Sequence, residues 1–358
     1  MHTTPTPTPP APERTPVPGA VGKGLAWAYE RVTAIRNGWY DVNAGKKLDR
    51  PVVSIGNLSA GGTGKTPMVI HLVGVLKEAK LNPAIAMRGY KAPGGNPAMS
   101  DEAQEYSRAL PLVPLAVGKD RAAELKEMFT TRRGHDVNCV LLDDGFQHRQ
   151  LFRDLDIVLI DATRSPFADR QLPAGLLREP VTGLKRAHAV VITHAQGVSR
   201  EQLAGLAEEI RGVHGKPPLA MCRHVWRTLV SGDGPASERN MSPDVLRGKR
   251  VAVACAIGNP APLLAAVRTL GEIVHALVLP DHDPFGASAV KKFAQGARDA
   301  KADVIVVTEK DWSKLRDLPA NTWPCPVLRP RLALSFSQGE QALSDLVVGT
   351  IKSWRKSK

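Results

Sequence analysis

Residues 54–67 read SIGNLSAGGTGKTP, and this stretch decides which fold the chain adopts. The apolar run VVSIG leads into a glycine-rich turn, and Thr66-Pro67 opens a segment in which apolar residues recur with helical spacing. A strand, a glycine-rich turn and a helix in this order are typical of a phosphate-binding loop, because the helix N-terminus then directs backbone N–H groups at phosphate oxygens. The stretch therefore predicts a nucleotide site.

The loop departs at one position from the usual spacing G-x-x-x-x-G-K-[ST], because Ser59 stands where the first glycine is expected. The remaining glycines let the backbone approach an anion without obstruction by a Cβ atom. We expect Lys65 to reach the β- and γ-phosphates and the Thr66 hydroxyl to face Mg²⁺. The expected loop residues are Ser59, Ala60, Gly61, Gly62, Thr63, Gly64, Lys65 and Thr66.

Short apolar runs alternate with longer helical stretches on both sides of this loop. Several runs have the continuous apolar character of parallel strands that are buried on both faces, at 51–56, 82–89, 138–144, 155–162 and 189–195. Further runs at 250–260, 272–282 and 302–311 indicate a second α/β set. The pattern predicts an α/β fold, with a P-loop NTPase-like doubly wound parallel sheet and a second, smaller α/β domain.

We expect the chain to be organised in consecutive segments around these sets. The first segments are a disordered proline- and threonine-rich tail at 1–19 and a phosphate-loop domain at 20–218, which begins with an amphipathic helix. A connector strand and polar loop follow at 219–247, and the second α/β domain at 248–324. The last segment, 325–358, is a return strand and a C-terminal helix that packs on the first domain. The extended segments at 219–230 and 325–336 are expected to pair as a two-stranded connector.

Composition limits the classes of partner. A net charge of +13 indicates an acidic partner, such as nucleic acid, an anionic membrane surface or a phosphorylated substrate. The 4 cysteines form no C-x-x-C pair, which disfavours a zinc site or a disulfide framework and fits a reducing cytoplasm. The tail lacks the apolar region of a signal peptide, and no run of about 18 apolar residues predicts a spanning helix.

The stretch NCVLLDDGFQHRQL, residues 138–151, carries the second chemical signal. An apolar strand that ends in Asp143 and Asp144 is where a phosphate-loop enzyme places the carboxylates that hold Mg²⁺. Gln147 and His148 follow closely enough to point into the same crevice. A surface turn after a strand is the alternative interpretation of this stretch.

These motifs, taken together, resemble one protein family. The segments are SIGNLSAGGTGKTP, MRGYK (87–91), SDE (100–102), LLDDGFQHRQLFRDLDIVLIDA (141–162), LPAGLLREP (172–180), IGNP (257–260), PDH (280–282) and VTEKD (307–311). In this order they look like the tetraacyldisaccharide 4′-kinases, the lipid A kinases of Gram-negative bacteria. The resemblance implies transfer of the γ-phosphoryl group of ATP to the 4′-hydroxyl of an acylated glucosamine disaccharide 1-phosphate.

The resemblance also implies roles for residues that the spacing alone leaves open. Asp101 is similar to the base that accepts the proton of the sugar hydroxyl, and His282 to a histidine that assists it. By themselves, Asp101 is equally compatible with a helix N-cap and His282 with a structural histidine. Arg178 and Glu179 match a family segment near the nucleotide, although an ion pair would also explain the arginine.

The segment VGKGLAWAYERVTAIRNGWYD, residues 21–41, has apolar residues at spacings of three and four, which predicts an amphipathic helix. The apolar face of this helix docks either on the protein's own core or in a membrane interface. The membrane interface is favoured because the acylated substrate that the resemblance implies is not found in free solution. We therefore expect a peripheral protein on the cytoplasmic face of the inner membrane, with no nucleic-acid partner and no obligate protein partner. The alternatives are an ATPase switch, which Ala60 disfavours because such switches carry a lysine there, and a kinase of a soluble molecule.

Overall fold

The computed structural model describes residues 17, 19–43, 45–89, 100–232, 238–281 and 283–356, apart from the side chains of Asp101 and Ala320. The chain divides into two compact units. The first, called here the phosphate-loop unit, consists of Pro16–His224 and Leu334–Lys358, and the second unit contains Val225–Ala333. The expected tail lies outside the described residues, except at its end. The strands β7 (Ala220–Ser231) and β12 (Val327–Gln338) each contribute residues to both units.

The sheet of the phosphate-loop unit has the strand order β7-β6-β5-β1-β4-β2-β3. Its strands pair in parallel, as the continuous apolar runs predict. The strand bounds are β1 Val52–Asn57, β2 Pro83–Met87, β3 Leu115–Val117, β4 Cys139–Asp143, β5 Leu155–Asp161 and β6 Ala189–Thr193. The predicted α/β class with a doubly wound parallel sheet is therefore confirmed.

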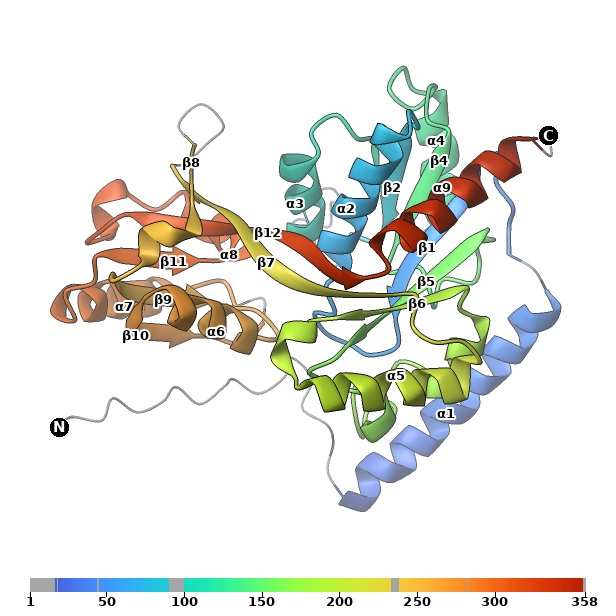
Figure 1. The fold of residues 1–358 in the computed structure, drawn as a ribbon, viewed down its shortest axis with the longest axis horizontal. Coiled ribbons are helices and arrows are strands. Elements are labelled where there is room, and N and C mark those ends of the chain that lie inside the picture. The colour runs from blue at the N-terminus through green and yellow to red at the C-terminus, as the bar shows by residue number, and fades with distance from the viewer. Residues whose placement is uncertain are drawn as a thin grey trace. The chain divides into compact units, whose positions relative to one another are not determined.

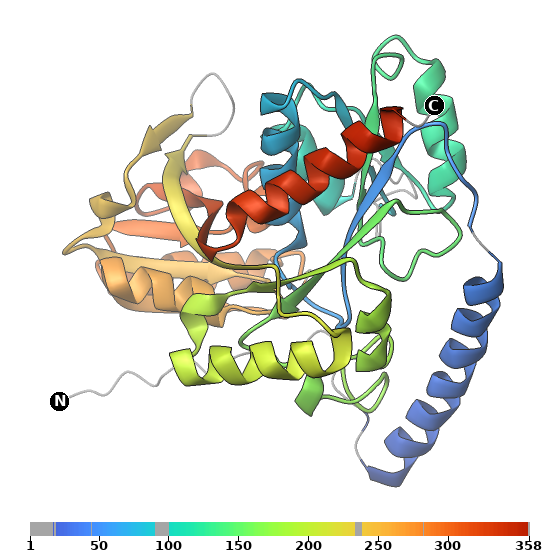
Figure 2. The same cartoon turned by 45° about the vertical axis from the view of Figure 1, so that its right-hand side comes forward.

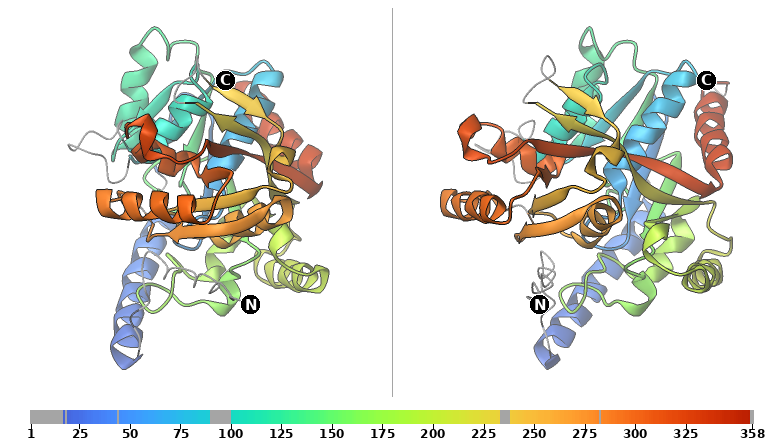
Figure 3. Two further views of the ribbon diagram at one scale, coloured as in Figure 1. Left: turned by 90° about the vertical axis from the view of Figure 1, so that its left-hand side faces the viewer. Right: turned by 60° about the vertical axis from the view of Figure 1, so that its left-hand side comes forward.

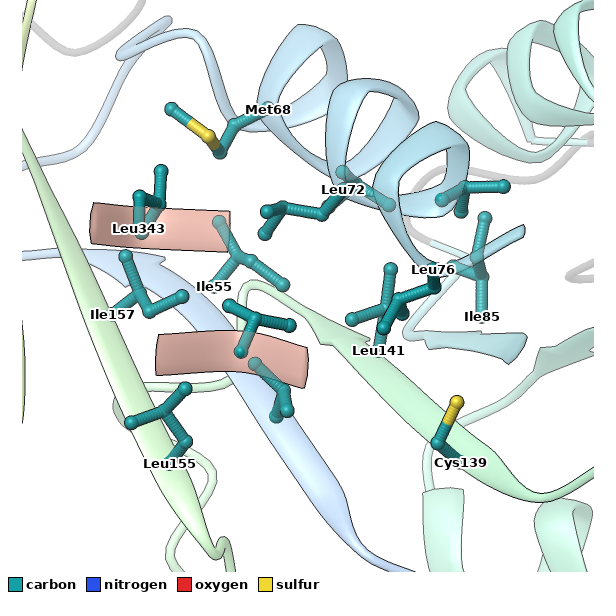
Figure 4. Packing of buried hydrophobic residues seen from close by; sticks show 14 of the residues in the cluster. Ile55, Met68, Leu72, Leu76, Ile85, Cys139, Leu141, Leu155, Ile157 and Leu343 are labelled. Carbon is teal, nitrogen blue, oxygen red and sulfur yellow. The ribbon is translucent and has the colours of Figure 1, made fainter. Parts of the chain in front are cut away.

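Helices cover both faces of this sheet (Figure 1). One face carries α2 (Lys65–Glu78), α3 (Asp101–Ala109) and α9 (Glu340–Lys356), and the other α4 (Arg121–Thr130) and α5 (Arg200–His214). Figure 4 shows how Leu72 and Leu76 of α2 pack over Ile55 and Leu141 of the strands below. This packing fixes the N-terminus of α2 at the edge where the strands end.

The second unit has the parallel strand order β10-β9-β11-β12. Its further strands are β8 (Arg239–Met241), β9 (Arg250–Cys255), β10 (Glu272–Val278) and β11 (Val304–Val307). Its helices are α6 (Ala261–Leu270) on one face and α7 (Ala287–Asp299) and α8 (Glu309–Leu315) on the other (Figures 1 and 3). The stretch expected to be a polar loop thus contains β8, which pairs antiparallel with β7.

The predicted N-terminal helix is present as α1 (Gly19–Val42), at the periphery of the phosphate-loop unit in each view (Figures 2 and 3). Its buried residues are the small ones, Gly22, Ala26 and Thr33. The apolar residues of the predicted stripe are instead exposed, with Leu25 at 51% and Ile35 at 75%. Docking of this stripe on the protein's own core is therefore wrong. No described helix is long and apolar enough to cross a membrane.

Candidate active site

The phosphate loop leaves β1 after Asn57 and enters α2 at Lys65. Gly61 and Gly64 have φ values of 119° and 82°, a region that favours glycine. Gly64 is the N-cap of α2 and supplies no side-chain hydrogen bond to the first turn. The loop thus presents the N-terminus of a helix at the C-terminal edge of a parallel sheet, an arrangement suited to an anion.

The segment around Leu177 pairs with the first residues of the phosphate loop. Ser59 forms a β-bridge with Leu177, and the Ala60 amide donates to the Leu176 carbonyl at 2.7 Å. Ser59, the departure from the usual glycine, therefore lies in an extended pairing. The serine is compatible with the turn because the positive φ angles occur later, at Gly61 and Gly64.

Asn57 is a loop-organising residue that the motif did not indicate. Its Nδ2 donates to the Ser59 carbonyl at 2.7 Å and to Thr63 Oγ1 at 2.9 Å, and its Oδ1 accepts from Lys65 Nζ at 3.3 Å. One buried amide therefore ties the beginning, the middle and the end of the loop together. A polar residue at the last position of an otherwise apolar strand is the signal that could have identified it.

Asp143 and Asp144 lie at the same edge, because β4 is the neighbour of β1 and Asp143 is in register with Ile55. Asp143 is 4% exposed and accepts a hydrogen bond of 3.1 Å from the Tyr106 hydroxyl. Burial, reinforced by Glu102, raises the pKa of Asp143 to about 6. Its Oδ1 has no hydrogen-bond partner among the described residues.

Asp144 differs from Asp143 in its surroundings. It adopts a φ of 50° and accepts hydrogen bonds of 2.7 and 2.6 Å from Arg178, while Lys65 Nζ lies 3.4 Å from its Oδ1. Burial raises the pKa of Asp144, but the two cations outweigh burial and hold that pKa below its ordinary range. The structure therefore brings Lys65, Asp144 and Arg178 into one charged cluster.

Gln147 and Glu179 form a second polar cluster beside the loop. Gln147 Nε2 donates to Glu179 Oε1 at 2.7 Å and to the Asn57 carbonyl at 2.8 Å. Glu179 is fully buried, and its other oxygen lies 2.9 Å from Arg186. His148 is nearby in sequence, and burial together with Arg121 lowers its pKa to about 4, so it is neutral at pH 7.

Tyr106 and Arg121 are further residues that the motifs did not indicate. Tyr106 is fully buried, and its hydroxyl, which donates to Asp143, also lies near the Thr66 side chain. Arg121, 3% exposed, donates to the Asp144 carbonyl at 3.1 Å. Both residues belong to helices with ordinary amphipathic sequences. Only the tertiary fold therefore identifies them as residues of this site.

The expected acid–base pair falls outside the described side chains. His282 is not among the described residues, and Asp101 is described only as the first residue of α3. The N-cap of this helix is Ser100, whose hydroxyl accepts from the Ala103 amide, so the N-cap interpretation of Asp101 is wrong.

The chain matches known proteins over most of its length. The family model described as tetraacyldisaccharide-1-P 4′-kinase matches residues 21–348. A tetraacyldisaccharide 4′-kinase of Syntrophus aciditrophicus is 37% identical over 314 residues, which are 80% of this chain and 82% of the relative. Another from Syntrophotalea carbinolica is 34% identical over 349 residues, 90% of both chains.

A solved structure shows the same architecture. The crystal structure of LpxK from Aquifex aeolicus in complex with ATP matches with a TM-score of 0.68 and 25% identity, covering 92% of this chain and 98% of that one. The fold, the loop with its adjacent carboxylates, and these matches lead to one conclusion. The chain belongs to the tetraacyldisaccharide-1-P 4′-kinase family.

Proposed function

We propose that this protein transfers the γ-phosphoryl group of ATP to the 4′-hydroxyl of a tetraacylated glucosamine disaccharide 1-phosphate, a step in lipid A biosynthesis. Membership of the family supports the reaction, and the relative with bound ATP supports the donor. The observation that carries the proposal is the placement of Lys65 at the start of α2, 3.4 Å from a carboxylate on the neighbouring strand. A phosphate loop with an adjacent acidic strand end is the arrangement that phosphoryl transfer requires.

The residues of the loop would bind and orient the donor. The backbone from Gly61 to Thr66 would hold the β-phosphate, and Lys65 would leave Asp144 to contact the β- and γ-phosphates. Arg178 would keep Asp144 oriented when the lysine has moved, because it contacts both carboxylate oxygens. The role of Gln147 and Glu179 would be to hold Asn57, and through it the loop.

The residues at the site fit a magnesium ion. Asp143 has a buried oxygen without a partner among the described residues, and Thr66 lies near Tyr106, whose hydroxyl contacts this carboxylate. Mg²⁺ takes most of its ligands from water and phosphate, so a few side-chain oxygens suffice to hold it. Bound Mg²⁺ would offset charge on the transferred group. Thr66, Asp143 and Asp144 would hold it.

Proton removal from the sugar hydroxyl would fall to Asp101 with help from His282, as the family resemblance implies. The first residue of α3 lies about 7.5 Å along the helix axis from Tyr106, since an α-helix rises 1.5 Å per residue. Tyr106 in turn contacts Asp143, so α3 begins close to the expected magnesium site. A carboxylate there could reach a hydroxyl that approaches the γ-phosphate.

The exposed stripe of α1 would place the enzyme on the membrane that contains its substrate. Val21, Leu25, Val32, Ile35 and Trp39 are each more than half exposed. Exposed tryptophan and aliphatic side chains on one helix, together with a net charge of +13, favour an anionic bilayer surface. The face would be the cytoplasmic one, where ATP is available.

Transfer of label tests the reaction. The protein is incubated with γ-labelled MgATP and detergent-dispersed tetraacyldisaccharide 1-phosphate, and labelled lipid is expected. Lys65→Ala should reduce transfer by at least about a hundredfold, because electrostatic stabilisation of the transferred group is lost. The control is Lys126→Ala, an exposed lysine on α4, which should leave transfer unchanged. ATP hydrolysis without labelled lipid would refute the proposal and favour an ATPase switch or a soluble acceptor.

Flotation with vesicles tests the role of α1. Wild-type protein should float with vesicles of phosphatidylglycerol and phosphatidylethanolamine, and the double variant Leu25→Gln/Ile35→Gln should lose most of this binding. Its melting temperature should not fall, because both side chains are exposed. Leu112→Gln is the matched control, since Leu112 is an 82% exposed leucine away from α1. Equal flotation of the double variant and the control would contradict membrane contact through this stripe.

A further inference from the structure

Arg178 connects three parts of the phosphate-loop unit. Its guanidinium contacts both carboxylate oxygens of Asp144, at 2.7 and 2.6 Å. Its amide donates to the carbonyl of Leu58, the first residue after β1, at 2.8 Å. Its carbonyl accepts a hydrogen bond of 3.0 Å from the hydroxyl of Tyr29, a residue of α1 that lies 149 positions earlier in the chain. The proposed mechanism needs only the first of these contacts, so the other two call for a physical reason.

The two backbone contacts fix the direction in which the Arg178 side chain leaves the main chain. Peptide units are planar, so holding the units before and after the Cα atom leaves little freedom to the two dihedral angles of this residue. The following residue, Glu179, is fully buried and precedes Pro180, which restricts its own backbone to extended conformations. The guanidinium therefore reaches Asp144 from a backbone that Leu58 and Tyr29 hold on either side of the Cα atom.

The contact between Arg178 and Asp144 is sensitive to this direction. A single guanidinium nitrogen, Nη1, donates to both carboxylate oxygens, so a small displacement of the arginine would lose one of the two bonds. Hydrogen bonds between ionised groups are strong only while their geometry is kept. Lys65, the other cation on Asp144, is farther away at 3.4 Å and is expected to move to the phosphates. The orientation of Asp144 in the loaded site therefore depends on how firmly Arg178 is held.

The inner face of α1 is docked on the segments that carry Asp144 and Arg178. The buried residues of this helix are small, so its packing contributes little grip by itself. Near its C-terminal end, Arg149 donates to the Asn37 carbonyl at 2.9 Å and to Asp41 at 2.7 Å. Arg149 follows Asp144 by only five positions in the chain. The helix thus meets the segment after Asp144 at one point and the Arg178 backbone at another.

We propose that Tyr29 is a positioning residue of the active site, whose hydroxyl fixes the Arg178 backbone and thereby the guanidinium that orients Asp144. The inference rests on the proposed function only in taking MgATP as the ligand of the site. The helix α1 then has two faces with different tasks, because the exposed stripe serves the membrane and the inner face supports the nucleotide site. Tyr29 acts through Arg178, so its effect must disappear when the guanidinium is removed.

A double-mutant cycle on the affinity for MgATP tests this coupling. Dissociation constants are measured by calorimetry with the full chain in detergent and without the lipid acceptor. Arg178→Met should weaken binding by at least about tenfold, because the charged hydrogen bonds that orient Asp144 are lost. Tyr29→Phe keeps the ring and should weaken binding by about three- to tenfold, as expected for one lost hydrogen bond. In the Arg178→Met background, Tyr29→Phe should change the dissociation constant by less than about twofold.

The matched control is Tyr40→Phe, which should leave the affinity unchanged, because this tyrosine of the same helix contacts Arg149 through its ring. Equal weakening by Tyr29→Phe in both backgrounds would overturn the inference, since the hydroxyl would then only support the helix. Unchanged binding in either single variant, Tyr29→Phe or Arg178→Met, would overturn it as well.

A second variant covers the case in which Arg178→Met lowers the melting temperature strongly. Arg178→Lys then takes its place in the cycle, because a lysine keeps the charge and lacks the planar guanidinium. The same loss of the Tyr29→Phe effect is expected in that background, and its persistence would count against the inference. Absence of labelled lipid from the wild-type protein would refute the proposed kinase activity and leave this binding comparison intact.

Discussion

Replacement of Tyr106 by phenylalanine should change the pH dependence of the reaction more than its maximal rate. The Tyr106 hydroxyl donates the hydrogen bond of 3.1 Å that Asp143 accepts, and both side chains are buried. The bond favours the ionised form of Asp143, whose pKa burial has raised to about 6. Tyr106→Phe keeps the ring in the core and removes this bond together with the proximity of the hydroxyl to Thr66.

The size of the effect follows from the strength of the lost bond. A buried hydrogen bond to a carboxylate contributes about 1.5 kcal/mol at the lower end, which corresponds to about one pKa unit. The pKa of Asp143 would then rise from about 6 to roughly 7. The ionised fraction at pH 6 would fall about fivefold, whereas at pH 8 it would fall by only about a tenth.

The appropriate measurement is kcat/KM for ATP at saturating lipid, because this quantity reports ionisations of the nucleotide-free enzyme. The acidic limb of the profile should move upward by about one pH unit in Tyr106→Phe and stay in place in the control Tyr40→Phe, whose hydroxyl lies on α1. An equal loss of activity at pH 6 and pH 8 would refute the reasoning, because it would mean that the hydroxyl acts without changing the ionisation of Asp143.

Two further predictions concern stability. Asp143→Asn should raise the free energy of unfolding at pH 7 by about 3 kcal/mol, because the folded protein ionises this carboxylate at about pH 6 and the unfolded chain near 3.8. The gain should shrink as the pH falls from 6 to 4, and denaturant titrations at pH 7 and pH 4 that gave equal gains would contradict it. Arg186→Met should lower the free energy of unfolding by about 3–5 kcal/mol, because it leaves the fully buried Glu179 without its cation. The double variant Arg186→Met/Glu179→Gln should recover part of that loss, and additive losses would show that the two side chains are not coupled.

The sequence predicts the parts of the site that depend on strand ends. The apolar runs at 51–56 and 138–144 coincide with β1 and β4, and both lead directly into polar residues. Because parallel strands bring their C-terminal ends to one edge, Lys65 and Asp144 meet there although they are distant in sequence. This much follows from local pattern and one topological rule.

The remainder depends on tertiary contacts that local pattern does not encode. Tyr106 occupies an ordinary apolar position of α3, and only the packing of that helix places its hydroxyl on Asp143. The strand β3, Leu115–Val117, is too short to give a periodic signal. For α1 the periodicity predicts an apolar stripe and leaves open what the stripe faces, since a helix can bury its small residues instead.

The charges around the loop favour binding of ATP together with a divalent cation, as proposed above. Asp144 lies 3.4 Å from Lys65 and 2.6 Å from Arg178, so phosphate oxygens that contact the lysine would compete with this carboxylate. When Lys65 turns to the phosphates, Asp144 keeps only Arg178, and Asp143, which is already difficult to ionise, faces further negative charge. Free ATP would therefore bring like charges together in a buried site, at a considerable cost in free energy. A divalent cation between the phosphates and the two carboxylates removes that repulsion, so the nucleotide and Mg²⁺ are expected to bind as one ligand.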